Sequence, residues 1–335
     1  MSSSDATEKR RTLRGVARPV SRIGIGTVGW GDAGRGFGEQ YRERGLAEAL
    51  DAALQGGIDF VDTAEVYGAK SSAWGQSAEQ ILGRIAKERR GGVVTDAEPE
   101  CCGAVPFVGT KVWTIPWTGA FMQGGAGGAP RTTAASLVDA LRASVARNEG
   151  APFDLWSIHY PFPTWSQEAL TDALTQGVEE GLCLAVGVSN YSAEQMEEAH
   201  ALLDRRGIPL ATNQVKWSVL DRTPETSGLA DKARDLDVCL VAHSPLEGGL
   251  LQASGDRDVV TLNKLLEFIG VIHGGFSATQ VALNYLMCKG ALPIPACTSA
   301  VRAREYAACL DFSLGPDDVA TIDEKLDYMA AQRKG

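Results

Sequence analysis

The sequence predicts an α/β protein folded as one (β/α)₈ barrel, the TIM barrel architecture. Eight short β-rich runs alternate with longer segments whose apolar residues recur three and four positions apart, which is the helical period. No long linker interrupts this alternation between about residues 20 and 310. The length of 335 residues suits a single α/β barrel, because this class often exceeds about 250 residues as one domain. A doubly wound sheet is the alternative, and periodicity separates the two poorly.

The predicted strands are short apolar runs that stop at polar residues. In chain order they are residues 22–28, 58–62, 105–111, 153–159, 183–189, 209–214, 238–244 and 292–295. Parallel neighbours require a long crossover, and helical patterns provide it. The predicted helices are 45–57, 78–90, 133–148, 166–180, 192–206, 225–236 and 276–289, with two more after the last strand. Eight such repeats favour the closed barrel.

Some segments do not belong to a minimal barrel. Residues 1–19 are predicted to be a flexible N-terminal segment, and residues 20–335 to form the barrel. Three Gly-rich stretches, 91–104, 112–131 and 247–260, are longer than typical connections. The second and third follow strand ends, so we expect them to form lid loops over the catalytic face.

Composition excludes several classes of protein. A net charge of −10, from 32 basic and 42 acidic residues, argues against a nucleic-acid partner. No apolar run is long enough for a transmembrane helix, so no membrane partner is expected. Seven cysteines without a CxxC pair favour a reducing compartment, although adjacent Cys101 and Cys102 could respond to oxidants. We expect a cytoplasmic protein, or a plastid protein if a transit peptide has been removed.

A GxGxxG pattern follows the first predicted strand. Gly24, Gly26 and Gly29 match it, but a dinucleotide-binding fold needs a helix that opens at the third glycine. The next residues, WGDAGRGFGEQ, are too rich in glycine for a stable helix. We therefore expect a barrel strand followed by a loop.

Ionisable residues end three consecutive predicted strands, where a barrel places its catalytic groups. Asp62 ends the second strand, Lys111 the third and His159 the fourth, and Tyr67 follows Asp62 by five residues. Each alone has an ordinary structural explanation. Together they predict a proton donor, because an ammonium group beside Tyr67 would lower the pKa of its phenol. Asp62 would hold Lys111, and His159 would orient a carbonyl oxygen that Tyr67 protonates as a hydride reaches the carbon.

The chain resembles the aldo-keto reductases, and among them it looks most like the plant and algal members. The resemblance spans roughly residues 20–330 and rests on FVDTAEVYG, GTKVW, LWSIHY, AVGVSNYS, TNQVKWSVLDR, AHSPLEGGLL, SATQVALNYLMCKGALPIP and AREYAACLDF. It implies NADPH-dependent reduction of aldehydes or ketones, with Asp62, Tyr67, Lys111 and His159 as catalytic residues. The cofactor-binding residues it implies are Gly26, Thr27, Ser189, Asn190, Gln214, His243, Ser244, Leu246, Arg302 and Glu305. The implied substrate pocket consists of Trp30, Trp113, Trp117 and Tyr160.

Departures from the family pattern concern the cofactor. His243 stands where most members stack an aromatic ring on the nicotinamide, so stacking should be weaker. Cationic positions near the 2′-phosphate are missing, which leaves Arg302 as the best candidate and keeps NADH possible beside NADPH. No cysteine or histidine cluster has metal-ligand spacing.

Two other functions remain open. A nucleotide-binding redox sensor with little turnover would also explain the altered cofactor contacts. A lyase that forms a Schiff base on Lys111 is less favoured, because Asp62 and Tyr67 support the charged amine. The partner is expected to be a small carbonyl compound of unknown identity, and the protein a monomer or weak homo-oligomer.

Overall fold

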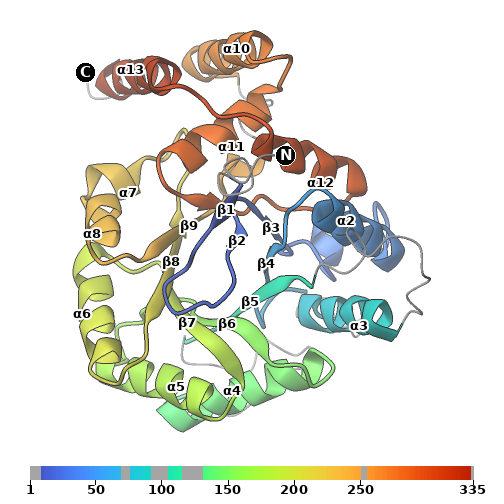
Figure 1. Cartoon of the computed structure of the whole chain (residues 1–335), viewed down its shortest axis with the longest axis vertical. Coiled ribbons are helices and arrows are strands. Elements are labelled where there is room, and N and C mark those ends of the chain that lie inside the picture. Colours follow the sequence, from blue (N-terminus) through green and yellow to red (C-terminus); the bar gives the residue numbers. More distant parts are fainter. Residues whose placement is uncertain (1–8, 69–75, 92–104, 115–130, 250–254, 333–335) are drawn as a thin grey trace.

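The computed structural model describes residues 9–68, 76–91, 105–114, 131–249 and 255–332, and within them eight parallel strands form a barrel (Figure 1). The strands are β3 Gly24–Gly26, β4 Phe60–Asp62, β5 Phe107–Val112, β6 Phe153–Ile158, β7 Cys183–Ser189, β8 Leu210–Lys216, β9 Cys239–His243 and β10 Leu292–Pro293. Each lies within or beside a predicted run and pairs with its chain neighbour. The predicted single barrel is therefore confirmed.

Helices surround the strands in a ring, and most match the predicted helical segments (Figure 1). They are α2 Glu43–Gln55, α3 Ala78–Gly91, α4 Ala134–Arg147, α5 Gln167–Glu179, α6 Ala193–Asp204, α7 Thr223–Thr226, α8 Leu229–Asp235, α10 Arg257–Ile272, α11 Ala278–Cys288, α12 Ala300–Ala307 and α13 Pro316–Gln332. Side-chain caps fix several starts: Thr133, Ser192 and Ser277 each form a capping box.

The barrel closes where the last strand meets the first. Gly26 donates its N–H to the carbonyl of Pro295 at 2.9 Å, and Cys297 donates to the carbonyl of Gly26 at 3.1 Å. A side chain at Gly26 would place a Cβ 3.2 Å from the carbonyl of Ile294. The GxGxxG segment thus contains a barrel strand, as the sequence predicted. This strand forms one side of the seam at which the barrel closes.

One predicted loop needs correction. The expected lid over 247–260 gives way to α10, which begins at Arg257 because the Asp256 carboxylate accepts the N–H groups of Asp258 and Val259. The described residues do not include residues 250–254 of this predicted lid or residues 115–130 of the other one. Cys101 and Cys102 also lie outside them.

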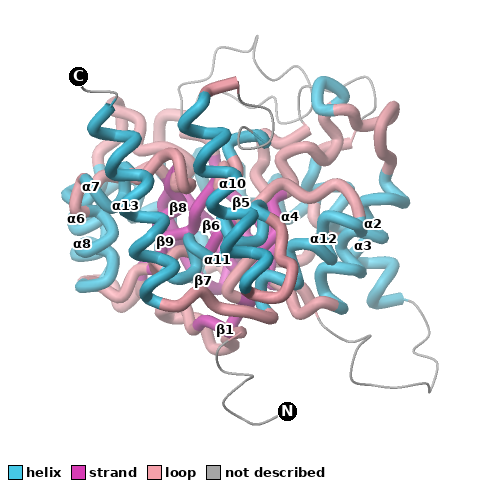
Figure 2. The backbone as a smooth tube through the Cα atoms, turned by 90° about the horizontal axis from the view of Figure 1, so that it is seen from above, coloured by secondary structure: helices cyan, strands magenta, loops and turns pink. Residues whose placement is uncertain are grey.

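The N-terminal segment is not flexible from residue 9 onwards. Strand β1, Arg10–Arg11, pairs antiparallel with β2, Val20–Ser21, and this hairpin lies across one end of the barrel (Figures 1 and 2). Leu13 and Val20 are fully buried against the inner layer of Phe60, Phe107 and other inward residues. The hairpin therefore plugs the end opposite the carboxyl ends of the strands, and its burial explains the order of residues 9–19.

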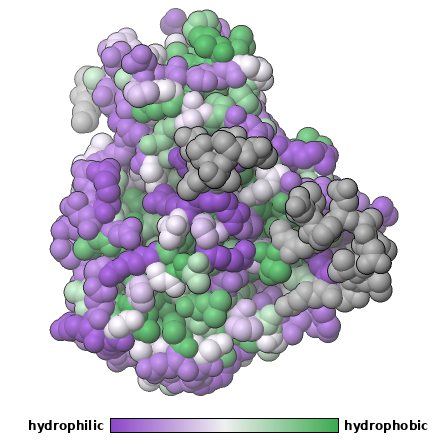
Figure 3. All heavy atoms as spheres, viewed as in Figure 1, coloured by the Kyte–Doolittle hydropathy of each residue, from purple (hydrophilic) through white to green (hydrophobic). Residues whose placement is uncertain are grey.

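The outer surface is largely hydrophilic, with an apolar area over α10 (Figure 3). Phe268, Val271 and Ile272 on that helix are each more than 60% exposed. No helix in the described ranges is long and apolar enough to cross a membrane.

Candidate active site

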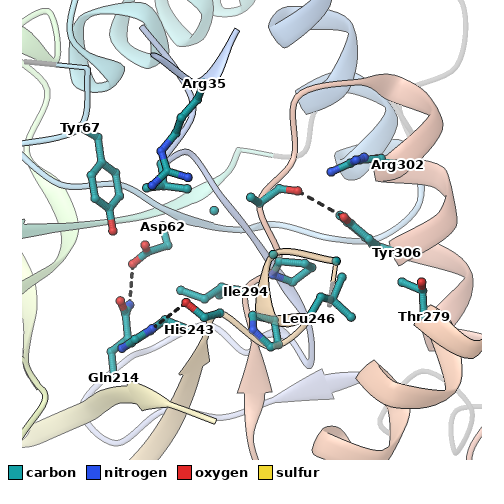
Figure 4. Close-up of a pocket in the computed structure, with 18 of the residues that line it drawn as sticks. Arg35, Asp62, Tyr67, Gln214, His243, Leu246, Thr279, Ile294, Arg302 and Tyr306 are labelled. Carbon is teal, nitrogen blue, oxygen red and sulfur yellow. Dashed lines mark hydrogen bonds between the residues drawn. The ribbon is translucent and has the colours of Figure 1, made fainter. Parts of the chain in front are cut away.

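A cavity of about 660 Å³ opens at the carboxyl ends of the barrel strands (Figure 4). Its volume lies within the range of about 300–1,000 Å³ that is usual for ligand pockets. The predicted site residues that line it are Gly26, Asp62, Tyr67, His159, Tyr160, Asn190, Gln214, His243, Ser244, Leu246, Arg302 and Glu305. The strand ends thus bring together most of the residues singled out in the sequence.

A buried ion pair lies beneath the cavity floor. The Nζ atom of Lys111 donates to both carboxylate oxygens of Asp62, at 2.6 and 2.7 Å, and to the carbonyl of Thr63 at 2.8 Å. The side-chain amide of Gln214 donates to Asp62 Oδ1 at 2.7 Å. Burial lowers the pKa of Lys111, and Asp62 opposes this effect. These bonds satisfy the pair, so Lys111 is held in one place without lining the cavity.

Tyr67 lies above this pair on the cavity wall. The Nζ atom of Lys111 is 5.1 Å from the centre of the Tyr67 ring, a cation–π distance. Burial raises the pKa of Tyr67 well above its usual value, and the Asp62 carboxylate raises it further. The expected lowering of this pKa by Lys111 is therefore wrong, because burial of the phenol and the charge of Asp62 both raise it. Tyr67 is a protonated phenol at neutral pH.

His159 lies against Tyr67, edge to face, at 6.2 Å between ring centres. Burial lowers the pKa of His159 well below its usual value, and the charge of Lys111 adds to the effect. Its buried Nδ1 atom has no hydrogen-bond partner among the described residues. Trp113 packs edge to face on His159 at 5.0 Å, and Tyr160 stacks on it at 5.6 Å. His159 is thus a neutral imidazole fixed by aromatic contacts.

The residues expected at the nicotinamide form a connected group. Asn190 donates to the carbonyl of His159 at 3.0 Å, and its Oδ1 lies 3.2 Å from Nε2 of His243. Burial, followed by the charge of Lys111, lowers the pKa of His243, which favours the neutral imidazole. Ser189 is fully buried and donates to the carbonyl of Gln214 at 2.8 Å. Ser189 positions this group from behind the cavity surface.

The far end of the cavity is formed by α12 and its neighbours. Arg302, Glu305 and Tyr306 line it beside Leu246 and Ser244 (Figure 4). Ser277 donates to the carboxylate of Glu305 at 3.0 Å. A cationic group therefore stands opposite the end that contains Tyr67.

Some predicted contacts are absent. Trp30 does not line the cavity: it is fully buried, and its indole N–H donates to the carbonyl of Cys297 at 2.8 Å. Thr27 is also fully buried and does not line the cavity. Trp117 lies outside the described residues. A strand end identifies the rim of a barrel, but the sequence does not tell which side chains there turn inward.

Sequence analysis missed Arg35 and Thr279, which also line the cavity. Arg35 belongs to a short 3₁₀ helix, η1 Ala33–Arg35, in the loop after β3. A Gly-rich loop gives no periodic signal, so nothing in the pattern marked this residue. Thr279 lies in the first turn of α11, which was predicted as a helix but not as part of the site.

The described residues show no cluster of histidine, cysteine or carboxylate side chains that could hold a metal ion. The site presents a protonated phenol, a neutral imidazole and a buried ion pair.

The chain is similar to known oxidoreductases. The chloroplastic pyridoxal reductase of Arabidopsis thaliana is 30% identical over 323 residues, covering 91% of this chain and 82% of that protein. A 6-dehydroglucose reductase of Novosphingobium aromaticivorans is 31% identical over 271 residues, covering 79% and 80%. The crystal structure of a silkworm (Bombyx mori) aldo-keto reductase superposes with a TM-score of 0.71 at 26% identity, covering 94% of this chain and 87% of that one. The aldo/keto reductase family model matches residues 22–327, so the chain belongs to that family.

Proposed function

We propose that the protein reduces aldehydes and ketones to alcohols with NADPH, using Tyr67 as the general acid. Membership of the family supports a nicotinamide-dependent oxidoreductase that acts on carbonyl groups. The observation that supports the proposal best is the position of Tyr67 on the cavity wall. It lies above the Asp62–Lys111 pair and beside a neutral His159.

The cavity has the shape and polar groups that a dinucleotide requires. Asn190 and Gln214 line the cavity with side-chain amides. Gln214 and Arg302 lie at opposite ends of it (Figure 4). A silkworm relative has been crystallised with NADPH, which supports the same cofactor here. Ser244, Leu246 and Glu305 would contact the middle and the adenine end of the dinucleotide. Arg302 is the principal candidate for binding the 2′-phosphate of NADPH. Because the other cationic positions of the family pattern are missing, the preference for NADPH over NADH should be weak, and NADH use is also expected.

When bound, the nicotinamide would supply the hydride. Residues of this chain would supply the proton and orient the substrate oxygen. Tyr67 holds a proton at its hydroxyl because burial keeps its pKa high. His159 is neutral and can hydrogen-bond the substrate oxygen without competing as an acid. The Asp62–Lys111 pair, tied to Gln214, keeps the base of the site rigid and excludes water from beneath Tyr67.

The substrate class follows from the aromatic wall. Trp113 and Tyr160 pack around His159 and lie beside Tyr67, so they offer flat apolar surfaces to a ring-bearing aldehyde. Among the relatives, the Arabidopsis enzyme is named for pyridoxal, a ring aldehyde. Pyridoxal and benzaldehydes are therefore the first substrates to test. Cytoplasmic or plastid localisation and a monomeric or weakly associated state stay predictions.

The test is turnover by the wild type and by Tyr67→Phe. Wild-type protein mixed with NADPH and pyridoxal or 4-nitrobenzaldehyde should consume NADPH. The Tyr67→Phe variant should lose about 10²–10⁴-fold in kcat while NADPH affinity, measured by fluorescence titration, stays unchanged. Tight NADPH binding without turnover by the wild type would favour the nucleotide-binding sensor instead. Undiminished turnover by Tyr67→Phe would exclude Tyr67 as the acid.

A further inference from the structure

A second cavity, of about 290 Å³, adjoins the first on the substrate side of Tyr67. Tyr67, Val28 and Arg35 line both cavities. Val66 and Trp113 add apolar side chains to the lining of the smaller cavity, and Asp32 adds a carboxylate. A molecule whose carbonyl reaches the Tyr67 hydroxyl can therefore extend the rest of its body into this side cavity.

Arg35 is the cation of the side cavity, and its backbone is well fixed. The hydroxyl of Tyr41 donates to the carbonyl of Arg35 at 3.1 Å and to that of Gly29 at 2.7 Å. The turn ends at Gly36, whose φ of 98° is in the left-handed region that favours glycine. These bonds anchor the loop, so Arg35 is presented from a defined position.

The guanidinium group of Arg35 is only partly engaged within the protein. Its Nε atom lies 3.4 Å from Oδ2 of Asp32, while Oδ1 of the same carboxylate accepts the N–H of Gly34 at 2.9 Å. Within the described part of the chain, Nη1 and Nη2 of Arg35 form no hydrogen bond, and the side chain is 58% exposed. Two terminal nitrogens of a planar guanidinium group are the donors that a carboxylate or phosphate binds in a bidentate manner.

Asp32, which also lines the side cavity, is the carboxylate paired with Arg35, and it faces the Nε atom and not the two terminal nitrogens. The Asp62 carboxylate is neutralised by Lys111, and Tyr67 is protonated, so neither cancels the cation. Burial favours the neutral form of His159. Arg302 lies across the larger cavity, away from Tyr67 and on the cofactor side (Figure 4). Arg35 is thus the cation that a substrate in the side cavity would meet.

We propose that Arg35 recognises an anionic group, carboxylate or phosphate, on the carbonyl substrate. This inference rests on the proposed reductase function and narrows its substrate class to carbonyl compounds with a negative charge remote from the reacting carbon. Val66 and Trp113 would enclose the body of such a molecule between its anionic group and Tyr67.

Two matched substrate pairs test the proposal: 4-carboxybenzaldehyde against benzaldehyde, and pyridoxal 5′-phosphate against pyridoxal. The wild type should prefer at least one anionic member. The Arg35→Ala variant should lower kcat/KM for that member by about 10–100-fold, the equivalent of one charge-assisted hydrogen-bond pair, and leave its neutral counterpart within about twofold. Which pair responds distinguishes carboxylate from phosphate. Arg44→Ala is the matched control, since Arg44 is 92% exposed on α2 and pairs with Glu48.

Two results would overturn the proposal. One is an equal loss on charged and neutral aldehydes. The other is weaker NADPH binding by Arg35→Ala, which would assign the residue to the cofactor. If the wild type reduces none of the aldehydes, the proposed reductase function fails separately. The dissociation constants of wild type and Arg35→Ala for 4-carboxybenzaldehyde and benzaldehyde then decide the role of Arg35.

Discussion

At the scale of single residues, burial sets the charge of the groups around the reacting atoms. It raises the pKa of Tyr67 well above 10 and lowers that of His159 well below 6.5. A general acid is active below its pKa, so carbonyl reduction should keep a constant kcat/KM from pH 7 to 9. Loss is expected only above the raised pKa of Tyr67, or well below pH 6.5, where His159 gains a proton at its lowered pKa. Steady-state rates across pH 5.5–10 check this, and an alkaline decline centred near pH 7–8 would contradict it.

The Asp62–Lys111 pair gives a second prediction, on stability. Lys111→Met leaves the Asp62 carboxylate buried without its cation, which should lower the free energy of unfolding by about 3–5 kcal/mol. Adding Asp62→Asn removes the stranded charge, so the double variant should be more stable than Lys111→Met alone. Urea denaturation followed by circular dichroism measures both. Equal stability of the two variants would show that the pair contributes through packing only.

At the scale of elements, one buried carboxylate holds the chain on both sides of residues 115–130. Glu65, after β4, has a side chain only 1% exposed and accepts the N–H of Trp113 at 2.5 Å. Arg131, before α4, donates to Glu65 Oε2 and to the carbonyl of Trp113, each at 2.8 Å. Trp113 in turn packs on His159. Glu65 and Arg131 therefore position the aromatic wall of the site.

Glu65→Gln should weaken the interaction of residue 65 with Arg131 and make the position of Trp113 less fixed. We expect KM for ring aldehydes to rise several-fold with a smaller change in kcat, because Tyr67 and the Asp62–Lys111 pair are untouched. Tryptophan fluorescence should change in parallel, which a purely structural effect elsewhere would not cause. Glu180→Gln, in an exposed ion pair with Arg142, is the control. A fall in kcat with constant KM would contradict a positioning role.

The strands and the residues at their ends show which parts of the fold and of the site could be predicted from the sequence. The eight strands are mostly buried and rich in apolar residues, so their pattern was readable, and Asp62, Lys111 and His159 lie at or next to the carboxyl ends of three of them. Strand β1 was not readable, because it consists of Arg10 and Arg11 and depends on pairing with β2. The direction of the Tyr67 pKa shift could not be predicted, since it depends mainly on how completely the folded chain buries the phenol.

At the scale of the whole molecule, the barrel must join segments about 250 residues apart in the chain. Besides the seam between β3 and β10, α2 packs against α12, which brings the first and last parts of the barrel together (Figure 1). Gly56, at the end of α2, lies at this contact: a Cβ there would stand 2.3 Å from the Cβ of Ala307. Its φ of −81° is open to any residue, so the constraint is one of space alone.

Gly56→Ala should therefore strain the closure of the entire barrel. Overpacking at a tight contact costs about 1–3 kcal/mol, because α2 and α12 must move apart or shift in register. Gly45→Ala is the matched control in the same helix, since a Cβ there meets nothing within 4 Å. That variant should be stabilised by up to about 1 kcal/mol, the difference in helix propensity between alanine and glycine. Thermal and urea unfolding of the two variants compare them directly. Equal stability would mean that the barrel absorbs the added methyl group, and that the β3–β10 seam, not the α2–α12 contact, fixes its closure.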